Sequence, residues 1–223
     1  MQGAIRAVAF DLFGTLVELA EPRNPYGRVL AALGLAAAER AQARRRLMSE
    51  PIGLAGVAPA LGLELEPHVL AEAEQDLYRE LASVRLFPEV ADVLRRLRAE
   101  GFRIALASNL ALPYAVPVRL LLPFELDAQA WSFELGAIKP DAAFYAQLCR
   151  RLGCAPADVL MVGDTFANDV EGARAAGLQA LHLDRSGVAG SGAIHSLADL
   201  SARIAAVARP GGAAQKATLP ASE

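Results

Sequence analysis

The fold is decided by VAFDLFGTLV, residues 8–17, in which an apolar run ends abruptly in Asp11. Leu12, Phe13, a glycine and a threonine follow. A carboxylate at the end of a buried strand is costly to remove from water, so we expect Asp11 to have a function. The large ring of Phe13 stands two residues later, at a position where a second polar group could have worked beside the first.

The bulk composition indicates one large domain, or a core domain with a smaller insert. The chain has 223 residues, 54% of them hydrophobic, and a formal net charge of −3. No long basic block is present, which argues against nucleic acid as a partner. Asp11 and Glu18 interrupt the first apolar run, and no stretch of membrane-spanning length is free of charges. We therefore expect no signal peptide, no membrane partner and a cytoplasmic location, with Cys149 and Cys154 reduced. The sequence does not indicate the oligomeric state.

Strand and helix patterns alternate along most of the chain. Short apolar runs predict strands at residues 5–10, 103–108 and 159–164, and weaker ones at 180–184 and 127–131. Apolar residues at helical spacing predict helices at residues 89–101, 142–153 and 168–177, each of which ends in a glycine. Continuous apolar runs are typical of strands buried on both faces. The pattern predicts an α/β fold: a doubly wound, Rossmann-like, mostly parallel sheet.

Residues 18–86 interrupt this rhythm, because they are rich in Ala, Leu, Arg and Glu and contain no convincing strand. We interpret them as a small all-helical domain inserted after the first strand. The run ERAQARRRL at 39–47 is interpreted as the solvated face of one of its helices. The core domain would then consist of residues 1–17 and 87–208. The remaining segment, 209–223, lacks periodicity and is predicted to be disordered.

Polar side chains follow the carboxyl ends of the predicted strands, which is where open parallel sheets bind ligands. The residues concerned are Asp11, Ser108, Asn109, Asp164, Asp169 and, in a loop before a helix, Lys139. Two carboxylates about 4 Å apart repel by roughly 4 kcal/mol at an effective dielectric of about 20. Three of them therefore require positive charge, which Lys139 supplies in part and a hard divalent cation would complete. Oxygen ligands without His or Cys favour Mg²⁺. Such a group of side chains suits a phosphoryl group, with Asp11 as a candidate nucleophile.

These motifs, in this order, resemble those of the haloacid dehalogenase superfamily of hydrolases. The resemblance rests on DxFGT at 11–15, Ser108-Asn109, Lys139 followed by proline, and GDTFAND at 163–169, and it reaches to about residue 200. It implies that residues 18–86 are a first-type (C1) helical cap that selects the substrate.

The resemblance also implies a role for each site residue. Asp11 would be the nucleophile and a metal ligand, and Thr15 would orient it. Ser108, Asn109 and Lys139 would hold the transferred group, with Lys139 also stabilising the nucleophile. The metal would be bound by Asp11, the backbone carbonyl of Phe13, Asp164 and Asp169.

Phe13 stands where most phosphatases of that superfamily carry a second aspartate, which protonates the leaving oxygen. General acid–base catalysis contributes about 10²–10⁴-fold, and Phe supplies none of it. The first interpretation is a Mg²⁺-dependent phosphatase that acts on a small phosphorylated metabolite through an aspartyl-phosphate intermediate. It would be restricted to good leaving groups, or would borrow an acid such as Glu18, Glu21 or His68.

Two further interpretations remain open. A metal-free dehalogenase needs no second acid, because halide leaves without a proton, and that branch resembles this chain in having an aromatic residue at position 13. Tyr145 also resembles its pattern, whereas Asp164 argues against it. The third interpretation is a weakly active or non-catalytic binding protein. Arg23 and Arg28 could meet an anionic substrate, although solvated positions are expected, and His182 is expected to be a satisfied core histidine.

Overall fold

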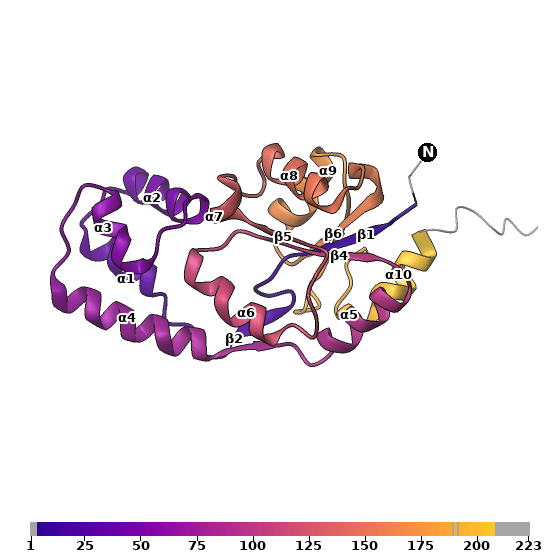
Figure 1. Ribbon diagram of the computed structural model, residues 1–223, viewed down its shortest axis with the longest axis horizontal. Coiled ribbons are helices and arrows are strands. Elements are labelled where there is room, and N and C mark those ends of the chain that lie inside the picture. Colours follow the sequence, from indigo (N-terminus) through magenta and orange to yellow (C-terminus); the bar gives the residue numbers. More distant parts are fainter. Residues whose placement is uncertain (1–3, 189, 191, 208–223) are drawn as a thin grey trace, which may run out of the picture.

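The computed structural model describes residues 4–188, 190 and 192–207, and its centre is a five-stranded parallel sheet (Figure 1). The strand order is β5-β4-β1-β6-β7, and all four pairings are parallel. The strands are β1 (Ala7–Phe10), β4 (Arg103–Ser108), β5 (Ala128–Trp131), β6 (Val159–Gly163) and β7 (Gln179–His182). The α/β parallel sheet predicted from the sequence is confirmed. The predicted disordered segment 209–223 lies outside the described residues.

Both faces of the sheet are buried, and side chains alternate between them along each strand. In β1, Val8 and Phe10 belong to one apolar cluster, while Ala7 and Ala9 belong to another on the opposite face. The helices α8 (Ala142–Leu152) and α9 (Ala173–Ala175) cover the alanine-lined face, and α5 (Val90–Ala99), α6 (Ala115–Leu121) and α10 (Leu200–Val207) lie on the other (Figure 1). Burial on both faces explains why the strands are continuous apolar runs rather than alternating ones.

The predicted helices were found with one difference. α5 and α8 match the predicted spans, and Gly101, Gly153 and Gly177 have the positive φ of left-handed helix ends. The helix predicted at 168–177 instead begins as a π-helical turn, Phe166–Gly172, and becomes α-helical only in α9. A four-residue helix, α7 (Ser132–Leu135), precedes the loop that contains Lys139. Short 3-10 turns occupy Leu54–Gly56, Leu112–Tyr114, Pro156–Asp158 and Leu197–Asp199.

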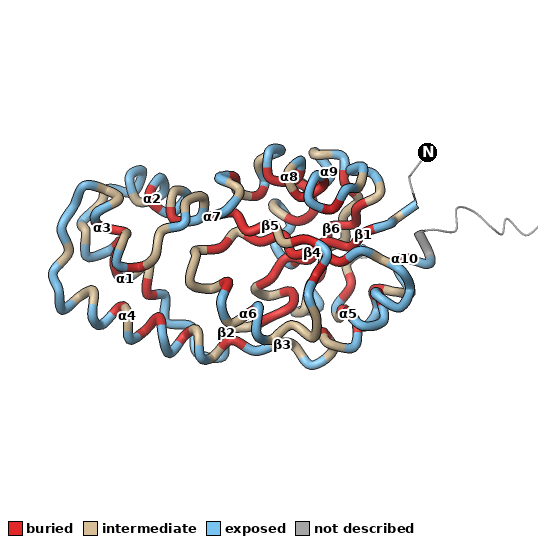
Figure 2. The backbone as a smooth tube through the Cα atoms, in the orientation of Figure 1, coloured by how far each residue is buried: buried red, intermediate tan, exposed pale blue. Residues whose placement is uncertain are grey.

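Residues 18–86 form a helical segment beside the sheet, at the left of Figure 1. Its helices are α1 (Pro25–Ala32), α2 (Ala37–Ser49), α3 (Val57–Ala60) and α4 (Pro67–Ala82). They bury an apolar cluster of their own, which includes Val29, Leu30, Leu47 and Leu77. Figure 2 shows buried stretches, in red, along these helices. Residues 39–47 lie on α2 and are mostly exposed, as predicted.

The expectation that residues 18–86 contain no strand was wrong. β2 (Val17–Leu19) and β3 (Val84–Leu86) pair antiparallel at the two ends of the helical segment. Each has three residues, too few to reveal an alternating pattern, and their pairing is non-local. The two strands bring the entry and exit of the helical segment side by side.

Two other features bear on earlier expectations. Cys149 and Cys154 are free thiols. Among the described residues, no helix combines the length and the apolar character that crossing a bilayer requires.

Candidate active site

Three neighbouring strands carry the predicted site residues to one edge of the sheet. Asp11 directly follows the central strand β1, and its amide continues the ladder by donating to the carbonyl of Val162 on β6 at 2.9 Å. Ser108 ends β4, and Asp164 follows β6. Because parallel strands end at the same edge, residues far apart in the sequence converge there.

The carboxylates of Asp11, Asp164 and Asp169 form a tight cluster. An oxygen from each lies within 4.8 Å of the others. The ammonium of Lys139 lies among them, with Nζ 2.8 Å from Oδ1 of Asp11 and 2.6 Å from Oδ1 of Asp169. Lys139, Asp11 and Asp169 are buried, whereas Asp164 faces solvent. The predicted convergence of these four side chains is present.

Burial and mutual repulsion disturb the ionisation of this cluster. Burial raises the pKa of Asp169 to about 6, and the charge of Asp11 adds to that rise while Lys139 opposes it. Partial desolvation and the same Asp11 charge also raise the pKa of Asp164, although this residue is exposed. Desolvation would lower the pKa of Lys139, but Asp11 and Asp169 outweigh it and the pKa is raised. Burial is the main cause of both raised carboxyl pKa values, and the negative charge of Asp11 adds to each.

The donor set fits a hard divalent cation. Three carboxylates and one ammonium give a formal charge of −2 when all are ionised, which one divalent ion would balance. All the side-chain donors are oxygens, as Mg²⁺ prefers. The close approach of three carboxylates to one another is the observation that such an ion would explain.

Two glycines let the carboxylates approach the backbone this closely. A Cβ on Gly14 would lie 2.3 Å from Oδ2 of Asp164, and Gly14 has a φ of 82°. A Cβ on Gly163 would lie 2.3 Å from Cγ of Asp169. Both distances are shorter than any real contact of that kind. The glycines of DxFGT and GDTFAND are therefore required by the packing of one motif against the other.

The remaining predicted residues lie at the same edge in different environments. Asn109 binds the backbone of Lys139 on both sides: its Oδ1 accepts from the Lys139 amide at 2.7 Å, and its Nδ2 donates to the Lys139 carbonyl at 2.9 Å. Asn109 thus positions the lysine loop, a role that the sequence did not suggest. Ser108 is buried at the end of β4. Thr15 is fully buried, and its hydroxyl has no hydrogen-bond partner within the described part of the chain.

Phe13 faces a cleft of about 410 Å³ between the helical segment and the strand ends. Its ring packs edge-on against the ring of Tyr114, with ring centroids 5.8 Å apart. The ring of Tyr114 also lies beside that of Tyr26 on α1, with centroids 6.3 Å apart. Tyr114 packs against the apolar clusters of both the core and the helical segment. Phe13 therefore belongs to an aromatic contact between the two parts of the chain.

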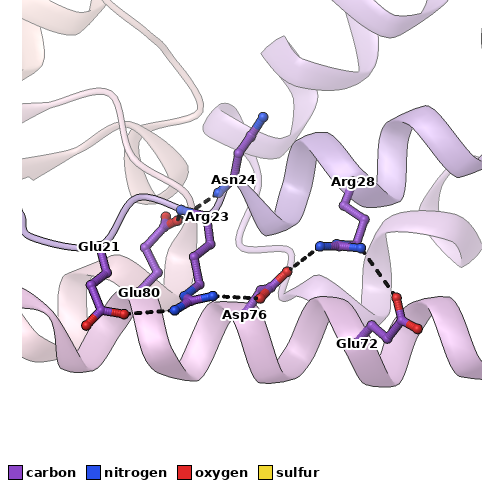
Figure 3. A network of polar contacts seen from close by, with 7 residues as sticks. All are labelled: Glu21, Arg23, Asn24, Arg28, Glu72, Asp76 and Glu80. Carbon is purple, nitrogen blue, oxygen red and sulfur yellow. Dashed lines mark hydrogen bonds and ion pairs between the residues drawn. The ribbon is translucent and has the colours of Figure 1, made fainter.

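A buried glutamate that sequence reasoning missed, Glu80, also lines this cleft. Glu80 of α4 accepts from the hydroxyl of Tyr114 at 2.5 Å through Oε1, and from the amides of Arg23 and Asn24 through Oε2. Figure 3 shows it beside the start of α1. On α4 the buried residues are Ala73, Asp76, Leu77 and Glu80. This is the spacing of one helix face, so periodicity could have indicated that both acids point inward.

The two arginines singled out in the sequence, Arg23 and Arg28, are paired within the helical segment. Arg23 and Arg28 both pair with Asp76, with nearest N–O distances of 3.7 and 2.7 Å, in the network of Figure 3. These partners account for their charge without an anionic substrate.

The three candidate substitute acids do not line the cleft. Glu18 pairs with Arg85 at 2.8 Å and Glu21 with Arg23 at 2.8 Å, while His68 is exposed at the first turn of α4.

Two other residues that the sequence analysis discussed, His182 and Tyr145, have backbone partners. His182 bonds the carbonyl of Asp164 at 3.0 Å, and the Tyr145 hydroxyl donates to the carbonyl of Asn168.

Comparison with known proteins identifies the class. A model of the haloacid dehalogenase-like hydrolase family matches residues 5–177. The chain belongs to this family and is a hydrolase of that type.

A curated relative and two solved structures refine the comparison. The phosphoglycolate phosphatase of Shigella boydii serotype 4 (strain Sb227) is 31% identical over 208 residues, covering 80% of this chain and 81% of that protein. A HAD phosphatase from Thermococcus onnurineus has the same fold, with a TM-score of 0.62 and 23% identity over 90% of this chain and 98% of the other. A 2-haloacid dehalogenase from Pseudomonas syringae pv. Tomato DC3000 is as similar in fold, with a TM-score of 0.60, 20% identity, and coverage of 91% and 99%. The fold is thus shared by phosphatases and dehalogenases, and only the site can distinguish them.

Proposed function

We propose that this hydrolase is a Mg²⁺-dependent phosphatase that acts on a small phosphorylated metabolite. The observation that carries the proposal is the cluster of Asp11, Asp164 and Asp169 around Lys139. A phosphoryl group brings negative charge that must be neutralised as it is transferred. Lys139 supplies one positive charge, and the three carboxylates would bind a Mg²⁺ ion that supplies more. The name of the Shigella relative makes phosphoglycolate a first substrate to test.

Asp11 is the nucleophile in this proposal. One of its oxygens forms a bond to phosphorus while the bond to the leaving oxygen breaks, and the leaving group departs with the electron pair. Water then attacks phosphorus, the bond to Asp11 breaks, and inorganic phosphate is released. Lys139 holds the nucleophile through Oδ1, and its charge stabilises the transferred group. Ser108 binds that group, Thr15 orients Asp11, and Asn109 keeps the lysine loop in register beside them.

Asp11, Asp164, Asp169 and the backbone carbonyl of Phe13 would hold the metal ion. When bound, Mg²⁺ would balance the charge of the carboxylates and of the phosphoryl oxygens.

The helical segment, residues 18–86, is proposed to act as the cap over this site, with residues 1–17 and 87–208 as the core. The paired strands β2 and β3 would be its two connections, and their adjacency suits a segment that moves as one unit. Its apolar cluster supports a separate packing unit.

Phosphate release tests the proposal directly. With 4-nitrophenyl phosphate or acetyl phosphate, turnover is expected to need Mg²⁺ and to disappear in Asp11→Asn. Activity that persists in excess EDTA would exclude the metal. Absence of turnover on every activated phosphate, together with full biological function of the Asp11 variant, would favour a non-catalytic binding protein.

A dehalogenase is the second candidate, because Phe13 cannot protonate a leaving group and a halide needs no proton. Against it, a third carboxylate beside Asp11 would remain unbalanced without a metal. Halide release from 2-chloropropionate in the presence of EDTA is the discriminating measurement, and we expect none.

A further inference from the structure

The cleft beside Phe13 is lined mainly by apolar and aromatic side chains. Among them are Phe13, Tyr26, Leu30, Met48, Leu110 and Tyr114. Its volume of about 410 Å³ lies within the usual range for small-molecule sites, about 300–1,000 Å³. It is therefore large enough for a ring, and its walls favour one.

The cleft lies next to the carboxylate cluster. Phe13 follows Asp11 by two residues, and Asn109, which also lines the cleft, binds the backbone of Lys139. A phosphoryl group held between Asp11 and Lys139 would thus leave the rest of its substrate facing the cleft.

The polar groups of the cleft are largely engaged already. Both oxygens of Glu80 accept hydrogen bonds from the protein, and both polar atoms of the Asn109 side chain are bound to the lysine loop. Asn24 uses Oδ1 to cap α1, accepting from the amide of Gly27 at 3.2 Å. Arg44 also lines the cleft, and its side chain is exposed to solvent. A leaving group rich in hydroxyls would find few free partners there and would lose its bonds to water.

The chemistry at Phe13 leads to the same class of leaving group. Phe13 provides no proton, so the leaving oxygen must depart as a stable anion. A phenol has a pKa of about 10, and a phenolate therefore leaves without protonation far more easily than an alkoxide. Aromatic side chains also pack favourably on a substrate ring.

We propose that the cleft binds an aromatic leaving group and that the preferred substrates are aryl phosphates. This inference rests on the proposed phosphatase activity. It goes beyond that activity in making Phe13 a specificity residue, one that selects an acidic, ring-shaped leaving group.

Phosphonates test the binding step without the chemistry, because their carbon–phosphorus bond is not hydrolysed. Phenylphosphonate and methylphosphonate are compared as competitive inhibitors of the Mg²⁺-loaded enzyme, at a pH where both are fully ionised. We expect phenylphosphonate to bind at least about tenfold more tightly, a difference of about 1.4 kcal/mol. Equal inhibition constants would overturn the proposal. Tighter binding of octylphosphonate than of phenylphosphonate would show that the cleft prefers an alkyl chain to a ring, and this result would also overturn the proposal.

A variant pair assigns the effect to this cleft. Met48 lines the cleft and is 37% exposed, so Met48→Glu places a charge there without burying it in a core. It is expected to weaken phenylphosphonate at least fivefold and methylphosphonate less than twofold. Tyr78→Glu introduces the same charge on α4 at a site that is 68% exposed and outside the cleft, and should change neither constant. Equal effects of Met48→Glu on both inhibitors would contradict the proposal.

Failure of this inference is distinguishable from failure of the proposed function. If activated phosphates are hydrolysed with Mg²⁺ but the two phosphonates inhibit equally, only the aromatic specificity is wrong. If no phosphate is released from acetyl phosphate or from any aryl phosphate, the phosphatase activity itself is wrong.

Discussion

Replacement of Lys139 by methionine is the sharpest test of the charge balance at the site. Methionine keeps an unbranched side chain but removes the ammonium that lies 2.8 Å from Asp11 and 2.6 Å from Asp169. Each contact is worth about 6 kcal/mol of gross Coulomb attraction at an effective dielectric of about 20. Most of this is offset by desolvation, and breaking a buried ion pair costs about 3–5 kcal/mol in measured cases.

We therefore expect Lys139→Met to lower the free energy of unfolding by about 3–5 kcal/mol in EDTA. For a chain of this size the loss corresponds to a decrease of about 6–20 °C in Tm. The variant leaves three carboxylates facing one another, so Mg²⁺ should bind it more tightly than the parent. Saturating Mg²⁺ should narrow the difference in stability by about 1.4 kcal/mol for each tenfold gain in affinity.

The assay is urea or thermal unfolding, with and without Mg²⁺. Arg85→Met is the control, since the Arg85–Glu18 pair has a similar distance of 2.8 Å but is largely exposed. Such pairs contribute about 0.2–1 kcal/mol. A loss below about 1 kcal/mol for Lys139→Met, or a difference in stability that Mg²⁺ leaves unchanged, would refute the charge balance described above.

Three further predictions concern the site. Gly14→Ala would place Cβ 2.3 Å from Oδ2 of Asp164, so the Mg²⁺ affinity measured by calorimetry should fall at least tenfold. Gly34→Ala is the control, because Gly34 has a similar positive φ of 64° but open space around it. This control should only lower the free energy of unfolding, by about 1–2 kcal/mol. Phe13→Asp should raise kcat on alkyl phosphates by tenfold or more, within the range of about 10²–10⁴ for acid–base catalysis, and no gain in a folded variant would mean that another group transfers the proton. Asn109→Ala removes two hydrogen bonds to the lysine loop and should destabilise the protein by about 1–3 kcal/mol and lower kcat; an unchanged kcat would show that the loop keeps its place without the amide.

The sheet could be predicted because its strands are buried on both faces. Arg103–Ser108 is recognisable as one apolar run, and the same holds for Val159–Gly163. β2 and β3 escaped detection because three-residue strands carry almost no periodic signal and depend on pairing with each other. The π-helical turn at Phe166–Gly172 escaped for another reason: its spacing differs from that of an α-helix by about one residue per turn, which a short segment does not reveal.

Asp11 and Asp164 could be predicted because strand ends are readable in the sequence, whereas Asp169 and Lys139 were found from a helix start and a loop before a helix. The role of Asn109 could not be predicted, because its side chain binds the backbone of Lys139 in a distant loop. Every residue has the same backbone atoms, so the sequence does not reveal such a partner. Glu80 was missed because it lies on a helix with several other acids. Only its position on the buried face distinguishes it from the solvated ones.

The central position of β1 has a consequence for how the protein is made. Ala7 pairs with Arg103 on one side and with Val159 on the other, so β1 is completed only by strands that are synthesised well after it. At about 5–20 residues per second, the nascent chain carries this apolar segment unpaired for roughly ten seconds or more. During that time Asp11 lacks Lys139 and the neighbouring carboxylates, Asp164 and Asp169. A chain released before β6 is synthesised would expose β1 as an unpaired apolar strand. The cluster of Asp11, Lys139, Asp164 and Asp169 can therefore assemble only after β6 has been synthesised.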